Sequence, residues 1–385
     1  MNEIKTIFIL GGVGFVGRAV TDKYLKNNWK VVILTRSKNL KEAKNKLSLH
    51  GYDKNLFAKS ISNGFLLFAL NVNLVDKKWS QTDIWIQLLK KLNQPSSSIL
   101  QIINLVGETS KSADEILKSN ITTLESVFTL VKFIKYQNKN CLFINMGSFA
   151  EKKESKKISP YEYAKKVARQ KIEKSNLCDF HFVPHYIKGK GEQKMKSVAP
   201  ILWNKLKFSH RWLFGFKVGV VDVDDLAEII YHIFEMNKIP SRGQKPVEVY
   251  VTNGEMVFGE IVKNLLPKNK QRIPSLIIPT WLEGLFLWFY SIIIPIVKSK
   301  DQFALRLASF AKRGLMDDKK QSEINDFKTA KDIKKLALDT FNYEILERNP
   351  NLIVFNKRHP VIYVLRERNK ETLKRMIQKA LLSSS

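Results

Sequence analysis

The sequence is poor in cysteine. Its 385 residues include 2 cysteines, Cys141 and Cys178, which are too few for a disulfide framework and lack the spacing of metal ligands. A disulfide-stabilised secreted domain is therefore excluded, and no metal site is expected. No cleavable signal sequence precedes the first apolar strand, which begins by Ile4, so a secretory route is not expected either. These features favour a reducing or matrix-like compartment.

Acidic residues are also scarce. The 65 lysines and arginines outnumber the 36 acidic residues and give a formal net charge of +29, spread along the chain. We find no zinc finger, helix-turn-helix or aromatic-interleaved basic motif in the sequence, so nucleic acid is a poor candidate partner. Anionic lipid or an acidic protein surface fits better, and a lysine-rich composition without any such partner is the alternative.

The first forty residues contain a nucleotide-binding pattern. The apolar run from Ile7 to Leu10 is typical of a buried parallel strand, and residues 18 to 27 are typical of a helix. Glycines at three-residue spacing separate them, so the helix N-terminus is expected to offer free N–H groups to a pyrophosphate. The residues predicted to contact the dinucleotide here are Gly11, Gly12, Gly14, Phe15, Val16 and Gly17.

The second strand, residues 30 to 34, predicts which dinucleotide is bound. An NAD-selective site usually has an acidic residue after this strand, whereas this chain has Arg36, followed by Ser37 and Lys38. A guanidinium binds a 2′-phosphate with two parallel hydrogen bonds, so the sequence favours NADP(H) over NAD(H). The alternative is that Arg36 is a solvated cation at the end of a strand.

A second group of residues points to acid–base chemistry. Tyr161 and Lys165 are four positions apart and share one face of a predicted helix, while Ser148 follows an apolar strand. We expect the Lys165 ammonium to lower the phenol pKa and bind the nicotinamide ribose, Tyr161 to exchange a proton with substrate, and Ser148 to polarise the substrate oxygen. Asn120 is predicted to open a helix and hold a relay water.

The remaining predicted contacts lie at two other strand ends. The strand from Ile99 to Leu105 is closed by Leu105, Val106 and Gly107, which are expected to contact the cofactor. Pro184 marks the end of a later strand and is also expected to contact the cofactor.

Together these motifs resemble the short-chain dehydrogenase/reductase superfamily in its extended or atypical branch, of the NAD-dependent epimerase/dehydratase type. The resemblance covers roughly residues 4 to 230 and implies a doubly wound parallel α/β sheet of the Rossmann type with a smaller C-terminal lobe. The sequence departs from the family pattern at two places. Asn71 and Asn73 follow the third strand where an aspartate is frequent, and Gly147 stands where a second serine is common.

An aromatic, apolar segment from 273 to 297 lies between basic flanks and is long enough to span a bilayer. Pro274, Pro279, Pro295 and Glu283 all argue against a simple span. Three interpretations stay open: an interfacial helix pair, a helix covered by a partner, and a transmembrane helix. The predicted domains are 1–180, an NADP(H)-binding core; 181–267, the rest of the core and a substrate lobe; and 268–385, an apolar helical, membrane-facing appendage with a basic extension.

Within the superfamily, the chain is similar to the group that contains the nucleotide-binding accessory subunit of respiratory complex I. The similarity rests on the glycine motif, on residues 104–107, and on the apolar stretch followed by residues 300–302 and 314–318. It implies a permanently held NADPH, an apolar C-terminal part against the membrane arm, and a place on the matrix side of the mitochondrial inner membrane or on the cytoplasmic face of a bacterial one.

Two functions therefore stand. The first is a structural or regulatory subunit that uses NADPH as a structural cofactor and contacts other subunits of a respiratory complex. The second is an active membrane-associated NADPH-dependent oxidoreductase or epimerase that uses Tyr161, Lys165 and Ser148 on a carbonyl, lipid or quinone-like substrate. The sequence favours the subunit narrowly and leaves turnover open.

Overall fold

The structure is a computed structural model, and it describes residues 5–107, 112–152, 159–192, 212–214, 217–235, 246–252, 254–257, 276–278, 353–355 and 361–365. The chain forms two compact units. The first comprises Met1–Gly191, Val221–Asn253 and Asn342–Lys370, and the second comprises Glu192–Val220, Gly254–Phe341 and Glu371–Ser385.

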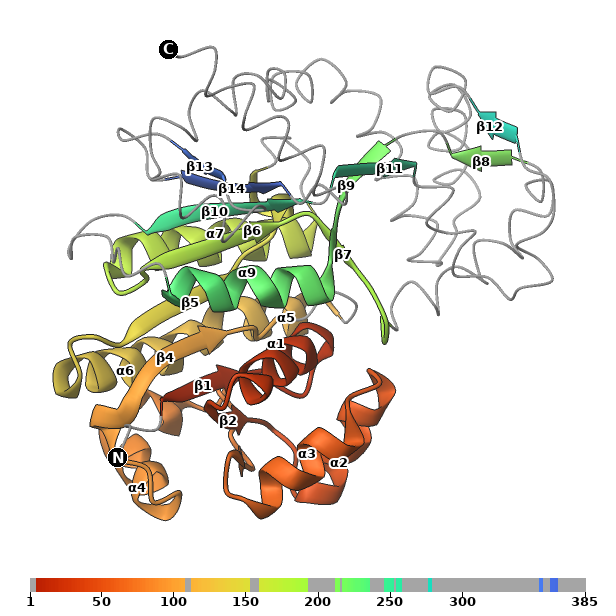
Figure 1. Cartoon of the computed structure of the whole chain (residues 1–385). Helices are drawn as coiled ribbons and strands as arrows, with labels where there is room; N and C mark the ends of the chain where they lie inside the picture. Colours follow the sequence, from red (N-terminus) through yellow and green to blue (C-terminus); the bar gives the residue numbers. More distant parts are fainter. Residues whose placement is uncertain are drawn as a thin grey trace, which may run out of the picture. The chain divides into compact units, whose positions relative to one another are not determined.

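The first unit is built on one large sheet (Figure 1) with the strand order β13-β14-β10-β6-β5-β4-β1-β2-β3. All neighbouring strands are parallel except β13 and β14. The strands are β1 Thr6–Leu10, β2 Lys30–Leu34, β3 Leu66–Ala69, β4 Ile99–Asn104, β5 Leu142–Met146, β6 Phe180–Pro184, β10 Val247–Thr252, β13 Ile353–Phe355 and β14 Val361–Leu365. The predicted Rossmann-type parallel sheet is confirmed. Strand order reverses at β1 and β4, where sheets of this kind bind ligands beyond the carboxyl ends of the strands.

Helices cover both faces of this sheet. Phe8 and Leu10 of β1 pack in one buried cluster with Leu124, Val127 and other residues of α6. On the other face α1 packs against α9, where Lys23 and Glu228 form an ion pair of 2.7 Å. The helices of this unit are α1 Phe15–Lys26, α2 Leu40–Leu49, α3 Lys54–Ser62, α4 Thr82–Lys91, α5 Ala113–Leu117, α6 Thr123–Gln137, α7 Pro160–Ser175 and α9 Val223–Glu235.

Short helical turns and one short strand complete the described part of the first unit. They are the 3₁₀ turns η1 Lys77–Ser80, η2 Ser96–Ser98 and η4 Phe149–Lys152, the π-helical turn η3 Lys118–Thr122, and β7 Tyr186–Lys188. Asn120 lies inside η3, between α5 and α6, so the prediction that it opens a helix is wrong. Its side-chain Nδ2 donates a hydrogen bond to the Ile116 carbonyl at 2.8 Å, which holds this widened turn within a continuous helical path.

The described part of the second unit consists of short strand pairs. Residues 217–220 of β9 Lys217–Asp222 pair antiparallel with β11 Gly254–Val257, and β8 Trp212–Phe214 pairs parallel with β12 Leu276–Ile278. The helix predicted over 273–297 is therefore wrong at 276–278. Pro274 and Pro279 bracket this stretch and its isoleucines are β-branched, so a strand is favoured over a helix.

The rest of the predicted membrane-facing appendage lies outside the described residues. Within the described part of the chain, every helix is too short or too polar to cross a bilayer.

Candidate functional site

The turn between β1 and α1 is shaped by close backbone contacts. Gly11 has a φ of +82°, which favours glycine. A Cβ on Gly17 would lie 2.5 Å from the Gly11 oxygen and from the Gly12 Cα, so only hydrogen fits there. A Cβ on Gly12 would lie 2.9 Å from the Ile33 side chain. The glycines therefore bring helix and strand together where a side chain would force them apart.

The first turn of α1 fits an anion. Its N-cap is Gly14, which offers no capping side chain, and the turn carries no acidic residue, all of it within the described part of the chain. Helix formation leaves the first N–H groups without helical partners, and those of Phe15 and Val16 belong to this set. A set of free N–H groups at the positive end of a helix dipole suits the pyrophosphate of a dinucleotide.

Basic side chains gather where β2 ends. Arg36 is exposed and makes no hydrogen bond or ion pair with any described residue. Next to it the buried Ser37 hydroxyl accepts a hydrogen bond from Lys46 Nζ at 3.2 Å, and Lys46 also pairs with Glu42 at 2.7 Å. Lys46 was not predicted from the sequence, although it lies in the last turn of α2, nine residues after Ser37.

Helix α7 brings the predicted acid–base residues to the same edge of the sheet. It begins at a Ser159–Glu162 capping box with proline in its first turn, which fixes the rotation of the helix. Lys165 is buried, its Nζ donates to the Met146 carbonyl at 3.3 Å, and the same atom lies 5.9 Å from the centre of the Tyr161 ring. Tyr163, a competing phenol on this helix, is 49% exposed.

The protonation of this pair is set mainly by burial. Burial raises the pKa of the Tyr161 phenol, the hydrogen bond with the Ser148 hydroxyl lowers it, and the Glu151 and Glu162 carboxylates raise it. Burial also lowers the pKa of Lys165, against the effect of Glu151. Tyr161 is therefore protonated at neutral pH. The expected lowering of this pKa by the Lys165 ammonium is not seen, because burial dominates and the net shift is upward.

The segment after β4 passes close to Lys165. A Cβ on Gly107 would lie 2.9 Å from Asn120 Oδ1 and 3.4 Å from Lys165 Nζ. The Leu105 N–H donates to the Leu10 carbonyl at 2.9 Å, which ties this segment to the strand that enters the glycine turn. Leu105, Val106 and Gly107 thus connect the glycine turn after β1 with the region around Lys165. Pro184 is buried at the end of β6.

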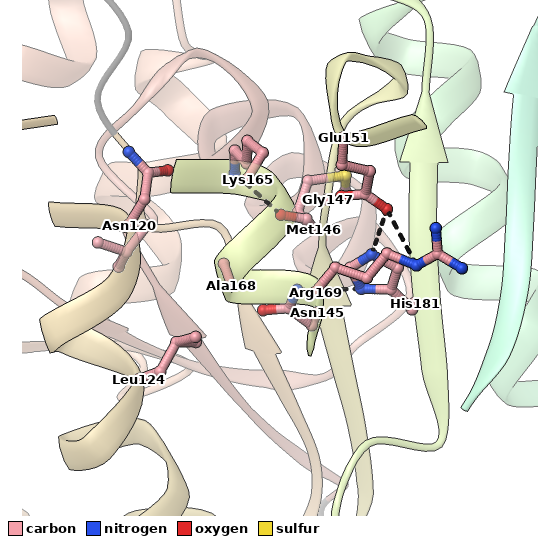
Figure 2. A pocket seen from close by; sticks show the side chains of 11 residues that line it. Asn120, Leu124, Asn145, Met146, Gly147, Glu151, Lys165, Ala168, Arg169 and His181 are labelled. Atoms are coloured by element: carbon pink, nitrogen blue, oxygen red, sulfur yellow. Dashed lines mark hydrogen bonds and ion pairs between the residues drawn. The ribbon is translucent and has the colours of Figure 1, made fainter. Parts of the chain in front are cut away.

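Four buried polar residues on or directly after the strands β4, β5 and β6 were not predicted as site residues: Asn104, Asn145, Glu151 and His181. Figure 2 shows three of them around a small cavity that Lys165 and Asn120 also line. All four are buried, and three of them sit within apolar strands. A polar residue in an otherwise apolar strand is a signal that the sequence does offer.

Comparison with known protein families identifies a family to which most of the chain is similar. Residues 7–245 match the profile of the family described as NAD dependent epimerase/dehydratase. No curated protein matches the chain.

Three solved structures are among those to which the chain is similar. The Bordetella bronchiseptica enzyme WbmH in complex with NAD⁺ is 14% identical, with a TM-score of 0.47 over 71% of this chain and 85% of that one. The UDP-Glc/GlcNAc 4-epimerase from Campylobacter jejuni is 12% identical, with a TM-score of 0.48 over 71% and 87%. The dTDP-4-dehydrorhamnose reductase from Bacillus anthracis in complex with NADP is 12% identical, with a TM-score of 0.46 over 71% and 84%.

Proposed function

The chain belongs to the NAD dependent epimerase/dehydratase family, and we propose that it binds NADP(H) and reduces a carbonyl substrate. The first turn of α1 would hold the pyrophosphate, and Arg36, Ser37 and Lys46 would hold the 2′-phosphate. Lys165 would bind the nicotinamide ribose. When bound, NADPH supplies the hydride.

One observation carries this proposal: Ser148, Tyr161 and Lys165 converge at the same carboxyl edge of the sheet as the glycine turn. The Tyr161 phenol would donate its proton to the substrate oxygen, and Ser148 would orient that oxygen by a hydrogen bond. The Tyr161 phenol carries its proton at neutral pH, as the proton donor of a reduction must.

The Arg36→Ala variant tests the cofactor assignment. We expect wild type to bind NADPH more tightly than NADH, and the variant to lose about thirtyfold in NADPH affinity, since a charge-assisted pair contributes about 2 kcal/mol. NADH affinity should stay within about twofold, because the hydroxyl makes no such pair. Isothermal titration with both nucleotides measures this, with Lys41→Ala, an exposed lysine on α2, as the control. Equal wild-type affinity for the two nucleotides would contradict the NADP(H) assignment.

A second candidate function is the accessory subunit of a membrane respiratory complex, with NADPH as a structural ligand. The net charge of +29 and the apolar segment at 273–297 between basic flanks support it. In this proposal the protein lies on the matrix side of the mitochondrial inner membrane, or on the cytoplasmic face of a bacterial one. A nucleotide that binds only the folded state then stabilises the subunit by mass action.

The Tyr161→Phe variant separates the two candidates. The enzyme proposal expects a loss of at least about a hundredfold in NADPH oxidation over a panel of carbonyl, lipid and quinone substrates, with NADPH affinity unchanged. The subunit proposal expects no turnover by wild type and a native mass, after gentle extraction from source membranes, far above that of one chain. A wild-type protein that turns over and migrates alone would rule out the subunit.

A further inference from the structure

A chain of buried hydrogen bonds crosses three strands beside the proposed site. Strand register pairs Asn104 of β4 with Asn145 of β5, and Asn145 with His181 of β6. Asn104 Nδ2 donates to Asn145 Oδ1 at 2.8 Å, and Asn145 Nδ2 lies 3.1 Å from His181 Nδ1. These three side chains are between 1% and 4% exposed, so the contacts are shielded from water.

The direction of this chain follows from its donors and acceptors. Because Asn145 Oδ1 already accepts from Asn104, the amide group of Asn145 donates to His181 Nδ1. His181 then carries its proton on Nε2, which lies 2.8 Å from Glu151 Oε1. Each hydrogen bond therefore runs from the Asn104 side to the Glu151 side, and the last acceptor is the Glu151 carboxylate. In such a chain successive hydrogen bonds strengthen one another.

The two ends of the chain hold two segments of the proposed site. At one end the Val106 N–H donates to Asn104 Oδ1 at 3.2 Å. At the other the Ser148 N–H donates to Glu151 Oε2 at 3.2 Å. Ser148 hydrogen-bonds to Tyr161, so Glu151 fixes the backbone that presents the proposed hydroxyl.

The position of the Glu151–His181 pair requires a glycine at residue 147. A Cβ at this position would lie 2.5 Å from His181 Nε2 and 2.6 Å from Glu151 Oε2. The histidine ring sits on a central strand and its partner is fully buried, so neither can move aside cheaply. The glycine leaves the space that the Glu151–His181 pair occupies.

We propose that Glu151 and His181 form a positioning pair that locks the Ser148 loop and the Val106 segment in place, with Gly147 as the position that admits them. Its importance for catalysis rests on the proposed function. The other charges that face Glu151 are Lys165 and Arg169, whose Nε lies 4.0 Å from Oε1. Arg169 also pairs with Glu173 at 2.9 Å and with Glu248 at 2.5 Å.

Proton NMR of the nucleotide-free protein tests the chain directly. A histidine N–H that donates to a buried carboxylate gives a slowly exchanging downfield resonance, and we expect one that disappears in His181→Asn. It should move upfield in Glu151→Gln and stay in place in Glu173→Gln, a matched change at the other side of Arg169. A wild-type protein without this resonance, or one whose resonance ignores Glu151→Gln, would overturn the proposal.

Hydrogen exchange tests the positioning role. In Glu151→Gln the Ser148 amide should exchange about tenfold faster, as expected for a weakened charge-assisted bond, and the Val106 amide by a smaller factor. The amides of α2 should keep their rates, whereas a general loss of stability would accelerate them too. Unchanged exchange at Ser148 would overturn the positioning role.

A double-mutant cycle tests the assignment of Gly147. Gly147→Ala should lower the melting temperature in wild type and lower it less in the His181→Ala background, where the ring no longer meets the new methyl group and Glu151 loses the partner that holds its carboxylate beside Gly147. Additive losses would overturn the assignment. All three measurements use protein without nucleotide, so they are independent of the Arg36 titration: failure to bind NADPH would remove the proposed function and leave the pair intact.

Discussion

The proposed site has two halves, one beside β1 and one beside β4, β5 and β6, and they use different chemical groups: backbone N–H groups in the first and buried polar side chains in the second. On the β1 side, glycines without side chains let one backbone segment approach another closely, and the groups offered to a ligand are backbone N–H groups of α1. On the β4–β6 side the chain adds buried polar side chains that hold one another by hydrogen bonds.

The difference matches the chemistry that each half is proposed to perform. A pyrophosphate is bound by several backbone N–H donors at a helix N-terminus, and these donors require few particular side chains. Proton transfer needs one phenol and one hydroxyl held to within a fraction of an ångström, which requires a supporting set of fixed neighbours. Disturbing the first half should therefore act through backbone sterics, and disturbing the second through lost hydrogen bonds.

Gly17→Ala is expected to have the largest effect. Its methyl group would lie 2.5 Å from backbone atoms of Gly11 and Gly12, which cannot rotate away, so α1 must move off the sheet. We expect a loss of about 3 kcal/mol in the free energy of unfolding, at the upper end for overpacking. Urea denaturation monitored by circular dichroism measures it.

Gly14→Ala is the matched control for this prediction. Its methyl group would meet only the Gly11 oxygen, at 3.3 Å, and its φ of −81° suits any residue. The free energy of unfolding should change by less than about 1 kcal/mol, while stabilisation by added NADPH should fall because the methyl group stands where the phosphates approach. Equal losses for the two variants would show that glycine is needed at both positions for folding alone.

Much of the first half could be predicted from the sequence because its signals are local. The strand, the glycine spacing and the helix follow one another within thirty-odd residues, and the family resemblance drawn from them is confirmed over residues 7–245. Even here α1 begins at Phe15, one turn before the predicted start, because glycine spacing marks the turn better than the first helical residue.

The second half could be predicted only in part, since it depends on strand register. Tyr161 and Lys165 are one helical turn apart and were predicted to share a face. Asn104, Asn145 and His181 lie in three separate segments, and only the pairing of β4, β5 and β6 brings them into line. Glu151 was missed because its carboxylate is buried by a 3₁₀ turn that composition does not predict. The domain boundaries, the roles of the site residues and the link to a respiratory complex stay predictions.

A smaller effect should come from Asp22 on α1, the buried carboxylate of the first half. Its Oδ2 lies 3.3 Å from Arg18 Nη1, but its Oδ1 has no hydrogen-bond partner within the described residues, and burial raises its pKa from 3.8 to about 6. The folded protein therefore keeps this proton between about pH 4 and pH 6 while the unfolded chain releases it. Across that window the Asp22 contribution to the free energy of unfolding falls as pH rises, by at most about 3 kcal/mol in total.

Asp22→Asn should remove this slope. Urea denaturation at several pH values from 4 to 7 would show stability of the variant falling less than that of wild type up to about pH 6, with the two curves running parallel above it. Asp83→Asn, an exposed acid on α4, should leave the slope unchanged. Identical slopes in wild type and Asp22→Asn would mean that Arg18 stabilises the buried Asp22 carboxylate as fully as His181 and the Ser148 N–H are proposed to stabilise Glu151. The two halves of the site would then differ only in their glycines.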